Sequence, residues 1–395
     1  MIERTGEVTL RIRAAAAIAA CVAAVSVSAE TVVDVTGVGA EKIAVSVNVG
    51  GDPAFAASLM KNLDLSGAFK LVKDGAVKVT GAAGSRIVAE GRGKVLSLPS
   101  SAADSKAARM EARRLADKMV ETFAKAKGFA CDRIAFVQKK GKDVSELCTS
   151  YPDGYDIVQL TSAGGSVVGP RWSGRDSVFY TGIRNAGPQV FEYDAAAKRE
   201  TKKWGFKGLS TGATKSPDGR HVAIILSMHG NPELYVIDTA AGTWTRLTTT
   251  PYASEGQPCW SPDGRSIVYV SDESRRPHLY VMDVATKKKT LITKSGSQNV
   301  DPDWGPDGRI AYITRRGGLG QVAVLDPKSG DKTAQLVGTP GSWEHPSWAR
   351  DGRHVVACDG AALYVVDTTP KERGGDDPKP LFRNPGVWIT PSWSR

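Results

Sequence analysis

Short apolar stretches alternate with polar turns over the C-terminal two-thirds of the chain, and this pattern returns about every 44 residues. Each repeat contains a Pro-x-Trp segment or its equivalent, which ends at Trp172, Lys215, Trp260, Trp304, Trp348 or Trp393. Most of these segments lead into a turn such as Ser261-Pro262-Asp263-Gly264, where proline fixes φ, aspartate bonds its own backbone and glycine accepts positive φ. The repeat therefore predicts a hairpin at the same point of every unit.

Three further strands are expected in each unit. After the turn, Ser266–Val270 is an apolar strand, Leu279–Asp283 is a second one that ends in aspartate, and Leu291–Thr293 is the last. The closing aspartate returns at Asp153, Asp194, Asp238, Asp283, Asp326 and Asp367. Four short antiparallel strands at this period are typical of a β-propeller blade.

The ends of the repeat region indicate how the ring closes. Arg133–Val137, Glu146–Ser150 and Ile157–Thr161 form three strands that no Pro-x-Trp segment precedes, whereas Pro391–Trp393 is such a segment without a blade. If the C-terminal segment supplies the innermost strand of the first blade, no sheet edge stays open. Residues 131–395 are therefore predicted to form an all-β six-bladed β-propeller closed by the C-terminal strand.

Residues 30–130 lack the repeat and are predicted to form a small N-terminal α/β domain. We expect strands at Thr31–Val35, Lys42–Val47, Phe69–Val72, Ala76–Thr80 and Ile87–Val95, and a short helix at Pro53–Asn62. Ser105–Lys127 is expected to be a helix, because its apolar residues return at spacings of three and four. Gly128 is expected to cap that helix at its C-terminus.

The first 29 residues have the pattern of a signal peptide. Arg11 and Arg13 precede the apolar run Ala14–Val27, and Val27-Ser28-Ala29 resembles a cleavage site before Glu30. Cys21 also fits a lipobox-like pattern, so lipoprotein processing there stays an alternative. No later stretch reaches the roughly 18 apolar residues of a membrane-spanning helix. We expect an exported protein of the periplasm with no transmembrane segment in its mature chain.

Charge and cysteines narrow the function classes. The formal net charge of +10 is spread thinly, without the concentrated basic and aromatic groove that nucleic acid needs, so no nucleic-acid partner is expected. Cys259 and Cys358 fall in different repeats and are expected to be core residues. Cys131 and Cys148 flank a predicted hairpin, and the sequence leaves open whether they form a disulfide.

The motifs of catalysis are absent or out of context. Gly208–Gly212 matches a nucleophile elbow, but it lies between two predicted blade strands rather than in a strand-turn-helix. The five histidines have no metal-ligand spacing, and most are expected to be solvated loop residues. Asp301, Asp303 and Asp307 crowd one loop without the calcium-loop pattern and are interpreted as turn-forming and capping residues. We expect no catalytic residues, no metal site and no cofactor.

The topology of a blade predicts a binding face. Loops between blades and loops between the second and third strands share one end of a propeller, and the Pro-Asp-Gly turns occupy the other. Polar groups, arginines and a tryptophan gather at the first end, as suits a protein partner, although solvated loop tips would look alike. The candidate residues are Ser254, Glu255, Gln257, Arg276, Ser297, Gln298, Asn299, Trp343, Glu344 and His345.

The order of motifs resembles the TolB family. The helix Glu111–Lys118 precedes Arg133–Val137, Asp153-Gly154-Tyr155, the Trp-Ser-Pro-Asp-Gly blades and a terminal Pro-Ser-Trp-Ser. The resemblance implies an adaptor of the Tol-Pal envelope system. It implies that the propeller binds a peptidoglycan-associated lipoprotein (Pal), with the best matching loop at Gly296–Asn299. It also implies that the mature N-terminal segment, with Glu30, Thr31, Val32 and Val33, binds a TolA-like inner-membrane protein.

Three hypotheses follow. The first is a periplasmic adaptor without catalytic activity that supports outer-membrane integrity and cell division. The second is a propeller hydrolase or lactonase with a metal site in the central channel, and the third is a substrate-binding propeller associated with a peptidase. A co-purified partner would favour the first hypothesis, bound metal the second, and a partner chain with a catalytic serine the third.

Overall fold

The computed structural model describes residues 41–162, 164–370, 375–382 and 386–394. The expected signal peptide, Cys21, the expected strand Thr31–Val35 and the candidate segment Glu30–Val33 lie outside the described residues. No helix in the described ranges has the length and apolar character that crossing a membrane requires.

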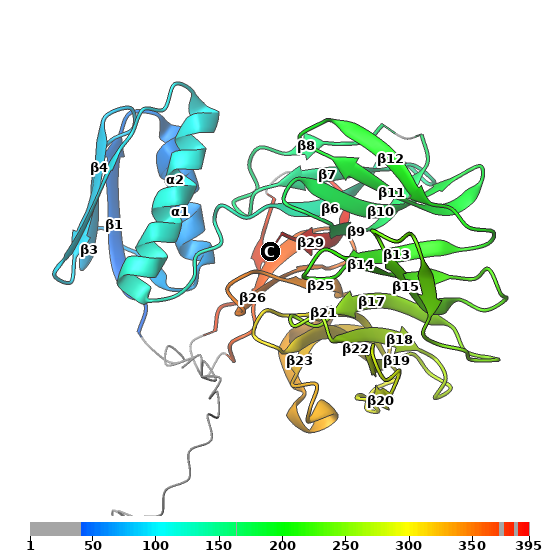
Figure 1. The fold of residues 1–395 in the computed structure, drawn as a ribbon. Helices are drawn as coiled ribbons and strands as arrows, with labels where there is room; N and C mark the ends of the chain where they lie inside the picture. The colour runs from blue at the N-terminus through cyan, green and yellow to red at the C-terminus, as the bar shows by residue number, and fades with distance from the viewer. Residues whose placement is uncertain (1–40, 163, 371–374, 383–385, 395) are drawn as a thin grey trace, which may run out of the picture. The chain divides into compact units, whose positions relative to one another are not determined.

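The N-terminal part is a five-stranded mixed sheet with two helices packed on one face (Figure 1). Its strand order is β2-β1-β3-β4-β5, and β1 pairs in parallel with both β2 and β3. The strands are β1 (Ile43–Gly50), β2 (Phe69–Leu71), β3 (Val77–Ala82), β4 (Arg86–Gly91) and β5 (Lys94–Pro99). The helices are α1 (Pro53–Leu65) and α2 (Ser105–Met119), and one apolar core lies between sheet and helices. The predicted α/β fold is confirmed.

The predicted strand Ile87–Val95 is wrong, because it contains a tight turn. Arg92 and Gly93 have φ of 51° and 72°, and they join β4 to β5 as an antiparallel hairpin. A two-residue turn with positive φ at both positions matches the twist of the strands it joins. The glycines on both sides of Arg92 were the available signal for this turn.

The end of α2 also differs from the prediction. The α-helix gives way to a π-helical turn at Val120–Ala124, and Lys125 ends it in the left-handed conformation with φ of 58°. Gly128 therefore does not cap this helix. Its lack of a side chain instead admits Asp117, whose Oδ1 atom would lie 2.3 Å from a Cβ atom at position 128. Asp117 uses that approach to accept hydrogen bonds from the backbone N–H groups of Ala130 (2.7 Å) and Cys131 (3.1 Å).

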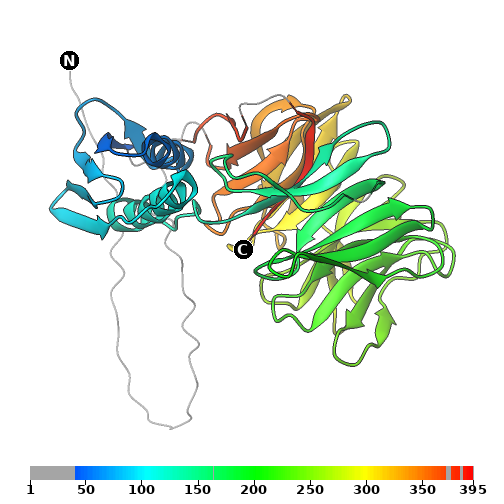
Figure 2. The same ribbon diagram turned by 90° about the horizontal axis from the view of Figure 1, so that it is seen from above.

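The remaining strands form six four-stranded antiparallel blades around a central axis (Figure 2). Blade 1 contains β29 (Trp388–Trp393), β6 (Ile134–Lys139), β7 (Ser145–Ser150) and β8 (Val158–Gln159). Blade 2 contains β9 (Ser166–Trp172), β10 (Ser177–Arg184), β11 (Gly187–Asp194) and β12 (Arg199–Trp204), and blade 3 contains β13 (Ser210–Lys215), β14 (His221–Leu226), β15 (Glu233–Asp238) and β16 (Trp244–Arg246). Blade 4 contains β17 (Glu255–Trp260), β18 (Ser266–Ser271), β19 (His278–Asp283) and β20 (Lys289–Leu291). Blade 5 contains β21 (Gln298–Trp304), β22 (Ile310–Arg316), β23 (Leu319–Leu325) and β24 (Gln335–Gly341), and blade 6 contains β25 (Glu344–Trp348), β26 (His354–Cys358), β27 (Leu363–Asp367) and β28 (Lys379–Pro380). The predicted six-bladed propeller is confirmed.

Blade 1 is completed by the last strand of the chain, as predicted. β29 pairs antiparallel with β6, with Trp393 opposite Ile134 and Trp388 opposite Gln138. The pairing continues past the strand, because the backbone N–H of Ser394 donates to the carbonyl of Arg133 at 2.8 Å. The first and last parts of the propeller therefore share one sheet.

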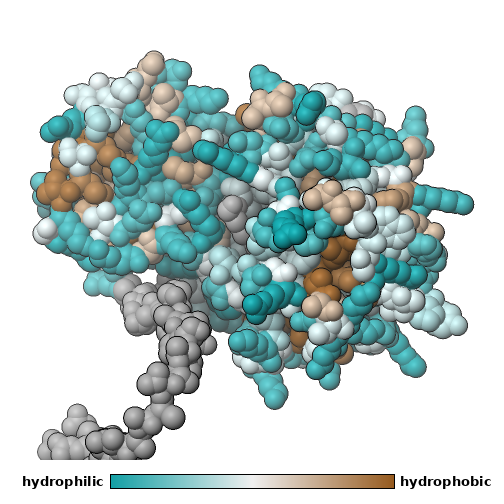
Figure 3. Space-filling model, viewed as in Figure 1, coloured by the Kyte–Doolittle hydropathy of each residue, from teal (hydrophilic) through white to brown (hydrophobic). Residues whose placement is uncertain are grey.

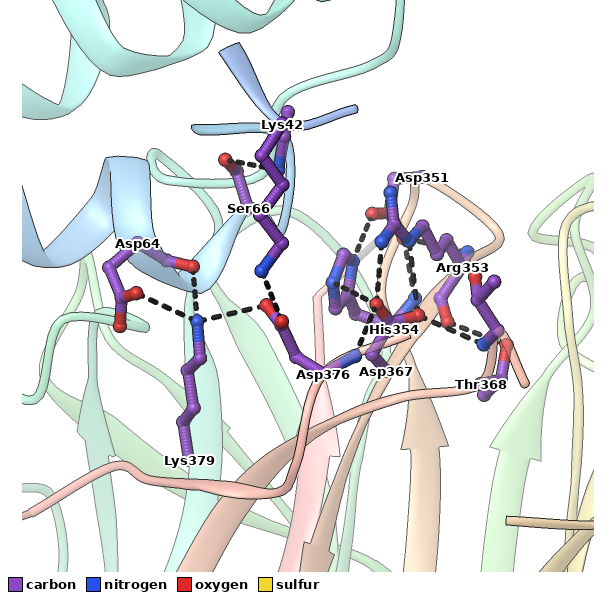
Figure 4. A network of polar contacts seen from close by, with 12 residues as sticks. Lys42, Asp64, Ser66, Asp351, Arg353, His354, Asp367, Thr368, Asp376 and Lys379 are labelled. Carbon is purple, nitrogen blue, oxygen red and sulfur yellow. Dashed lines mark hydrogen bonds and ion pairs between the residues drawn. The ribbon is translucent and has the colours of Figure 1, made fainter. Parts of the chain in front are cut away.

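Two sets of ion pairs hold blade 1 and blade 6 to the helices of the α/β domain. Arg113 of α2 is fully buried and bonds both carboxylate oxygens of Asp153, at 2.8 and 2.9 Å. Figure 4 shows the second set, in which Lys379 lies between Asp64 and Asp376. Lys379 Nζ donates to the carbonyl of Asp64 at 2.6 Å and to its Oδ1 atom at 2.9 Å. Asp153, expected only to close its unit, thus also anchors a helix.

Candidate protein-binding face

Each innermost strand contains a β-bulge at the same point, three residues before the repeat tryptophan or Lys215. The bulged residues have positive φ, and they are Gly169 (57°), Gly212 (67°), Gln257 (52°), Asp301 (55°), His345 (51°) and Thr390 (47°). Positive φ is uncommon outside glycine, and a bulge re-aims the side chain that carries it. The ring of bulges therefore gives the three neighbouring blades 4, 5 and 6 large polar residues at equivalent places.

Those three residues bond to one another from blade to blade. The side chain of Gln257 accepts a hydrogen bond from the backbone N–H of Asp301 at 2.9 Å and donates another to its carboxylate. Asp301 in turn accepts from the backbone N–H of His345 at 3.1 Å and pairs with its Nδ1 atom at 3.0 Å. Burial alone would raise the pKa of Asp301, but His345 outweighs it and lowers that pKa. Asp301, interpreted from sequence as a turn residue, is the centre of this polar arc.

The other aspartates of that segment point to different partners. The carboxylate of Asp303 accepts from the backbone N–H of Trp348 at 2.7 Å and from Arg171 Nη1 at 3.0 Å, whereas Asp307 accepts from the backbone N–H of Arg309. Among the described residues, no three His, Cys, Asp or Glu side chains gather as ligands for a metal ion.

Glu255 lies inside the protein rather than on the face. The residue is 4% exposed, and its side chain accepts hydrogen bonds from Thr250 Oγ1 and Ser271 Oγ, both at 3.1 Å. Burial, and then the neighbouring carboxylate of Glu233, raise the pKa of Glu255 to about 7. Glu233 itself bonds Arg246 at 2.8 Å. This buried carboxyl pair supports the strand that leads to Gln257.

The Glu255 pKa gives a testable pH dependence. The folded value lies above the ordinary carboxyl value of about 4.3, so the folded state binds this proton more tightly than the unfolded state. The group's contribution to stability is then fully present below the unfolded pKa and is lost as the pH rises through about 7. At pH 8, the free energy of unfolding of Glu255→Gln should therefore exceed that of the native chain by roughly 1 to 3 kcal/mol, and its unfolding temperature should be higher. At pH 4.5 the two proteins should unfold at nearly the same temperature.

Thermal unfolding at pH 4.5, 6, 7 and 8 measures this difference. The exposed Glu273 of the same blade provides the control Glu273→Gln, for which no such trend is expected. An equal difference between Glu255→Gln and the native chain at all four pH values would contradict the raised pKa.

The remaining candidates divide into exposed tips and buried supports. Ser254, Arg276, Ser297 and Gln298 are exposed, and Gln257, Glu344 and His345 are half-buried. Asn299 is buried and bonds the carbonyl of Ser295 at 2.7 Å, and Trp343 is buried with its ring 5.4 Å from that of Tyr364. We call the end of the propeller that carries these ten candidates the loop face. Its exposed residues are polar, and buried residues with defined contacts lie beneath them.

The loop face also carries apolar side chains that sequence reasoning missed. Tyr252 lies in the loop between blades 3 and 4 and is 99% exposed, and Leu319 at the start of β23 is also exposed. Hydrophilic side chains cover most of the surface viewed in Figure 3, with apolar ones in smaller areas. Tyrosine is one of the residue types that dominate the binding energy of protein interfaces. Its position in a loop between blades was the available signal.

The structure differs from the prediction for two histidines and agrees with it for two cysteines. His278 in β19 and His354 in β26 are buried strand residues rather than solvated loop residues. His354 Nδ1 lies 2.6 Å from a carboxylate oxygen of Asp351, and Figure 4 draws these two residues in one network of polar contacts. Cys259 and Cys358 are buried, as expected, and the structure joins neither Cys131 nor Cys148 in a disulfide.

The fold and this face define a class of protein: six-bladed β-propellers preceded by an α/β domain and closed by their last strand. A family model described as the TolB beta propeller domain matches residues 120–395. The chain belongs to the TolB family.

Known relatives share part of the chain. The chain is 32% identical over 250 residues to the Tol-Pal system protein TolB of Gluconobacter oxydans, and this match covers 62% of this chain and 54% of the relative. It is 30% identical over 159 residues to the Tol-Pal system protein TolB of Anaeromyxobacter dehalogenans, and that match covers 40% of this chain and 36% of the relative. The matched part thus spans about half the length of these curated relatives or less. The crystal structure of TolB from Acinetobacter baumannii has the same fold, with a TM-score of 0.75 at 20% identity over 90% of this chain and 97% of that one.

Proposed function

We propose that this protein is a non-catalytic adaptor of a Tol-Pal envelope system in the periplasm. The observation that carries the proposal is the loop face, where exposed polar and aromatic tips stand on a hydrogen-bonded arc that joins three blades. Rigid support lets such tips bind without first losing conformational freedom. Membership of the TolB family supports the choice of system, because the curated relatives of the chain are named Tol-Pal system proteins.

The partner proposed for the loop face is a Pal-like peptidoglycan-associated lipoprotein. Tyr252, Arg276, Ser297 and Gln298 are the exposed residues expected to contact it, and Gln257, Asp301 and His345 position their loops. A TolA-like protein is the proposed partner of Glu30–Val33, at the start of a mature chain that follows a signal peptide of residues 1–29. The α/β domain is then residues 30–130 and the propeller 131–395.

The expected result is that the purified chain retains a Pal-like lipoprotein, identified by mass, from the detergent-solubilised envelope of its own organism. Tyr252→Ala and Arg276→Glu should each lower the recovered lipoprotein about tenfold or more, because truncating an interface anchor costs about 1.4 kcal/mol or more. Both side chains are exposed, so neither change should alter folding. A chain that lacks Glu30–Val33 should keep the lipoprotein and lose the TolA-like protein.

Lys288→Glu is the matched control, because Lys288 is an exposed cation in the turn between β19 and β20, at the opposite end of the propeller. Its recovery should equal that of the native chain. The proposal would be overturned if the native chain consistently retained no Pal-like lipoprotein. It would also be overturned if Tyr252→Ala and Arg276→Glu retained as much of it as the control Lys288→Glu. No observation in the described residues favours the hydrolase or the peptidase-associated alternative.

A further inference from the structure

A second candidate site lies at the other end of the propeller channel. A cavity of about 1090 Å³ opens among the Ser-Pro-Asp-Gly turns and is lined by the inner strands of all six blades and by two residues of α2, Met110 and Arg114. Its inner end contains Arg171 and Asp303, whose side chains meet at 3.0 Å. These residues belong to blades 2 and 5, which face each other across a ring of six, so the ion pair crosses the channel. The cavity is therefore separated from the polar arc of the loop face.

Lys215 lines the cavity at the repeat position that holds tryptophan in the other five blades. Trp172, Trp260 and Trp348 each donate their indole N–H to a backbone carbonyl of the preceding blade, at 2.9, 3.1 and 3.0 Å. Each indole thus fills the space between neighbouring inner strands. Lys215 occupies that position in blade 3, and a flexible ammonium side chain neither fills the same volume nor prefers to be enclosed.

Lys215 is half-buried, and no ion pair or hydrogen bond of its ammonium group to another described residue is present. Buried or half-buried ammonium groups are normally paired, because removing them from water costs free energy. Asp218, the nearest carboxylate along the chain, is held by Ser216 Oγ at 2.6 Å and by the backbone N–H of Arg220 at 3.0 Å. The half-buried ammonium group of Lys215 therefore has no counterion among the described residues.

The rest of the lining is also more basic than acidic. Arg133, Arg171 and Arg350 line the cavity and are paired with Asp176, Asp303 and Asp132 respectively. Burial raises the pKa of Asp132 to about 8, although Arg350 acts in the opposite direction. Arg175, which also lines the cavity, is exposed and its side chain bonds no other described residue. The charge that remains is positive.

We propose that this cavity binds an acidic peptide segment of a protein partner, with a carboxylate on Lys215. Ligand pockets are typically about 300–1,000 Å³, so the volume suits a stretch of several residues better than a single small anion. Access from the turn end means that this segment and the partner of the loop face bind at opposite ends of the channel. The site is thus independent of the adaptor function proposed above.

The test uses the full chain and a fluorescently labelled hexaglutamate peptide, followed by fluorescence anisotropy at about 0.15 M salt. The native chain should bind it, Lys215→Met should weaken binding about tenfold or more, and Lys215→Trp should abolish it by refilling the repeat position. Lys288→Met removes an equal charge from an exposed turn at the same end and should bind as the native chain does. Thermal unfolding of each variant shows that a loss of binding is not a loss of fold.

Three outcomes would overturn the proposal. Native-like binding by Lys215→Met would remove Lys215 from the site, and an equal loss with Lys288→Met would indicate general charge attraction. Displacement of the peptide by inorganic phosphate at millimolar concentration would assign the cavity to a small anion instead. Selective loss with Lys215→Met that phosphate does not reproduce would support the peptide site.

Discussion

Trp393→Ala is expected to lower the free energy of unfolding by about 3 to 5 kcal/mol, the range of large-to-small changes of buried aromatic residues. Trp393 is 2% exposed and lies in the strand that closes the ring. Its ring packs edge-on against Phe129 with the centroids 5.2 Å apart, and its backbone N–H donates to Ser347 Oγ at 3.0 Å. The substitution removes the ring contact with Phe129, in the segment that enters the propeller, and leaves a void in the apolar core that blades 1 and 6 share.

Deleting Pro391–Arg395 should have a larger effect than the substitution. The deletion removes the pairing of Trp393 with Ile134 and of Ser392 with Ala135, and it leaves that part of β6 as an open sheet edge. Open edges pair with other chains, so the shortened protein is expected to aggregate or to unfold at ordinary growth temperature. Net stabilities of roughly 5 to 15 kcal/mol leave little margin for this loss.

Urea unfolding, followed by fluorescence and circular dichroism, measures both changes. Trp244→Ala is the matched control, because Trp244 is 44% exposed in the outermost strand of blade 3 and its loss should cost about 1 kcal/mol or less. If Trp393→Ala were no more destabilising than Trp244→Ala, the closing strand would not hold the ring together.

The propeller could be predicted from sequence because the strands and turns of each blade are determined by short stretches of neighbouring residues. A turn such as Ser261-Pro262-Asp263-Gly264 needs only its own four residues, and the repeat then supplies the count and the closure. The errors fall where local signals compete. In the α/β domain, apolar residues on both sides of Arg92 read as one strand, and the amphipathic pattern of α2 continued past the π-helical turn that ends it.

The face was predictable to the level of topology, and its interactions were not. Which loops share an end of the propeller follows from alternating strand directions alone. That Asp301 joins Gln257 to His345 depends on residues in three blades, each 44 positions from the next, that meet only when the ring is closed. The raised pKa of Glu255 likewise depends on its burial and on the carboxylate of Glu233 in the neighbouring blade. Contacts across blades have no signal in a single sequence.

Arg113→Met is expected to lower the free energy of unfolding by about 3 to 5 kcal/mol, because breaking a buried ion pair leaves its partner charge uncompensated. The Arg113 side chain is 0% exposed, bonds Asp153 through two nitrogens, and lies 2.9 Å from Asp156 Oδ2. Burial alone would raise the pKa of Asp156, but hydrogen bonds from Arg109 and Arg113 lower it below its ordinary value. Removing Arg113 therefore leaves one buried carboxylate without its ion-pair partner and another with a single arginine.

Arg114→Met provides the control, since Arg114 is the exposed neighbour of Arg113 on α2 and its loss should cost about 0.5 kcal/mol or less. The double variant Arg113→Met with Asp153→Leu should recover part of the loss, because it removes the orphaned charge together with its partner. Urea unfolding gives the three free energies.

Limited proteolysis between α2 and β6 shows whether the helix has separated from blade 1. In the native chain Asp153 also accepts a hydrogen bond from Ser58 of α1 at 2.6 Å, so it contacts both helices. Equal stability of Arg113→Met and Arg114→Met would mean that this ion pair does not join the α/β domain to the propeller, whereas a selective loss restored by the double variant would establish that it does.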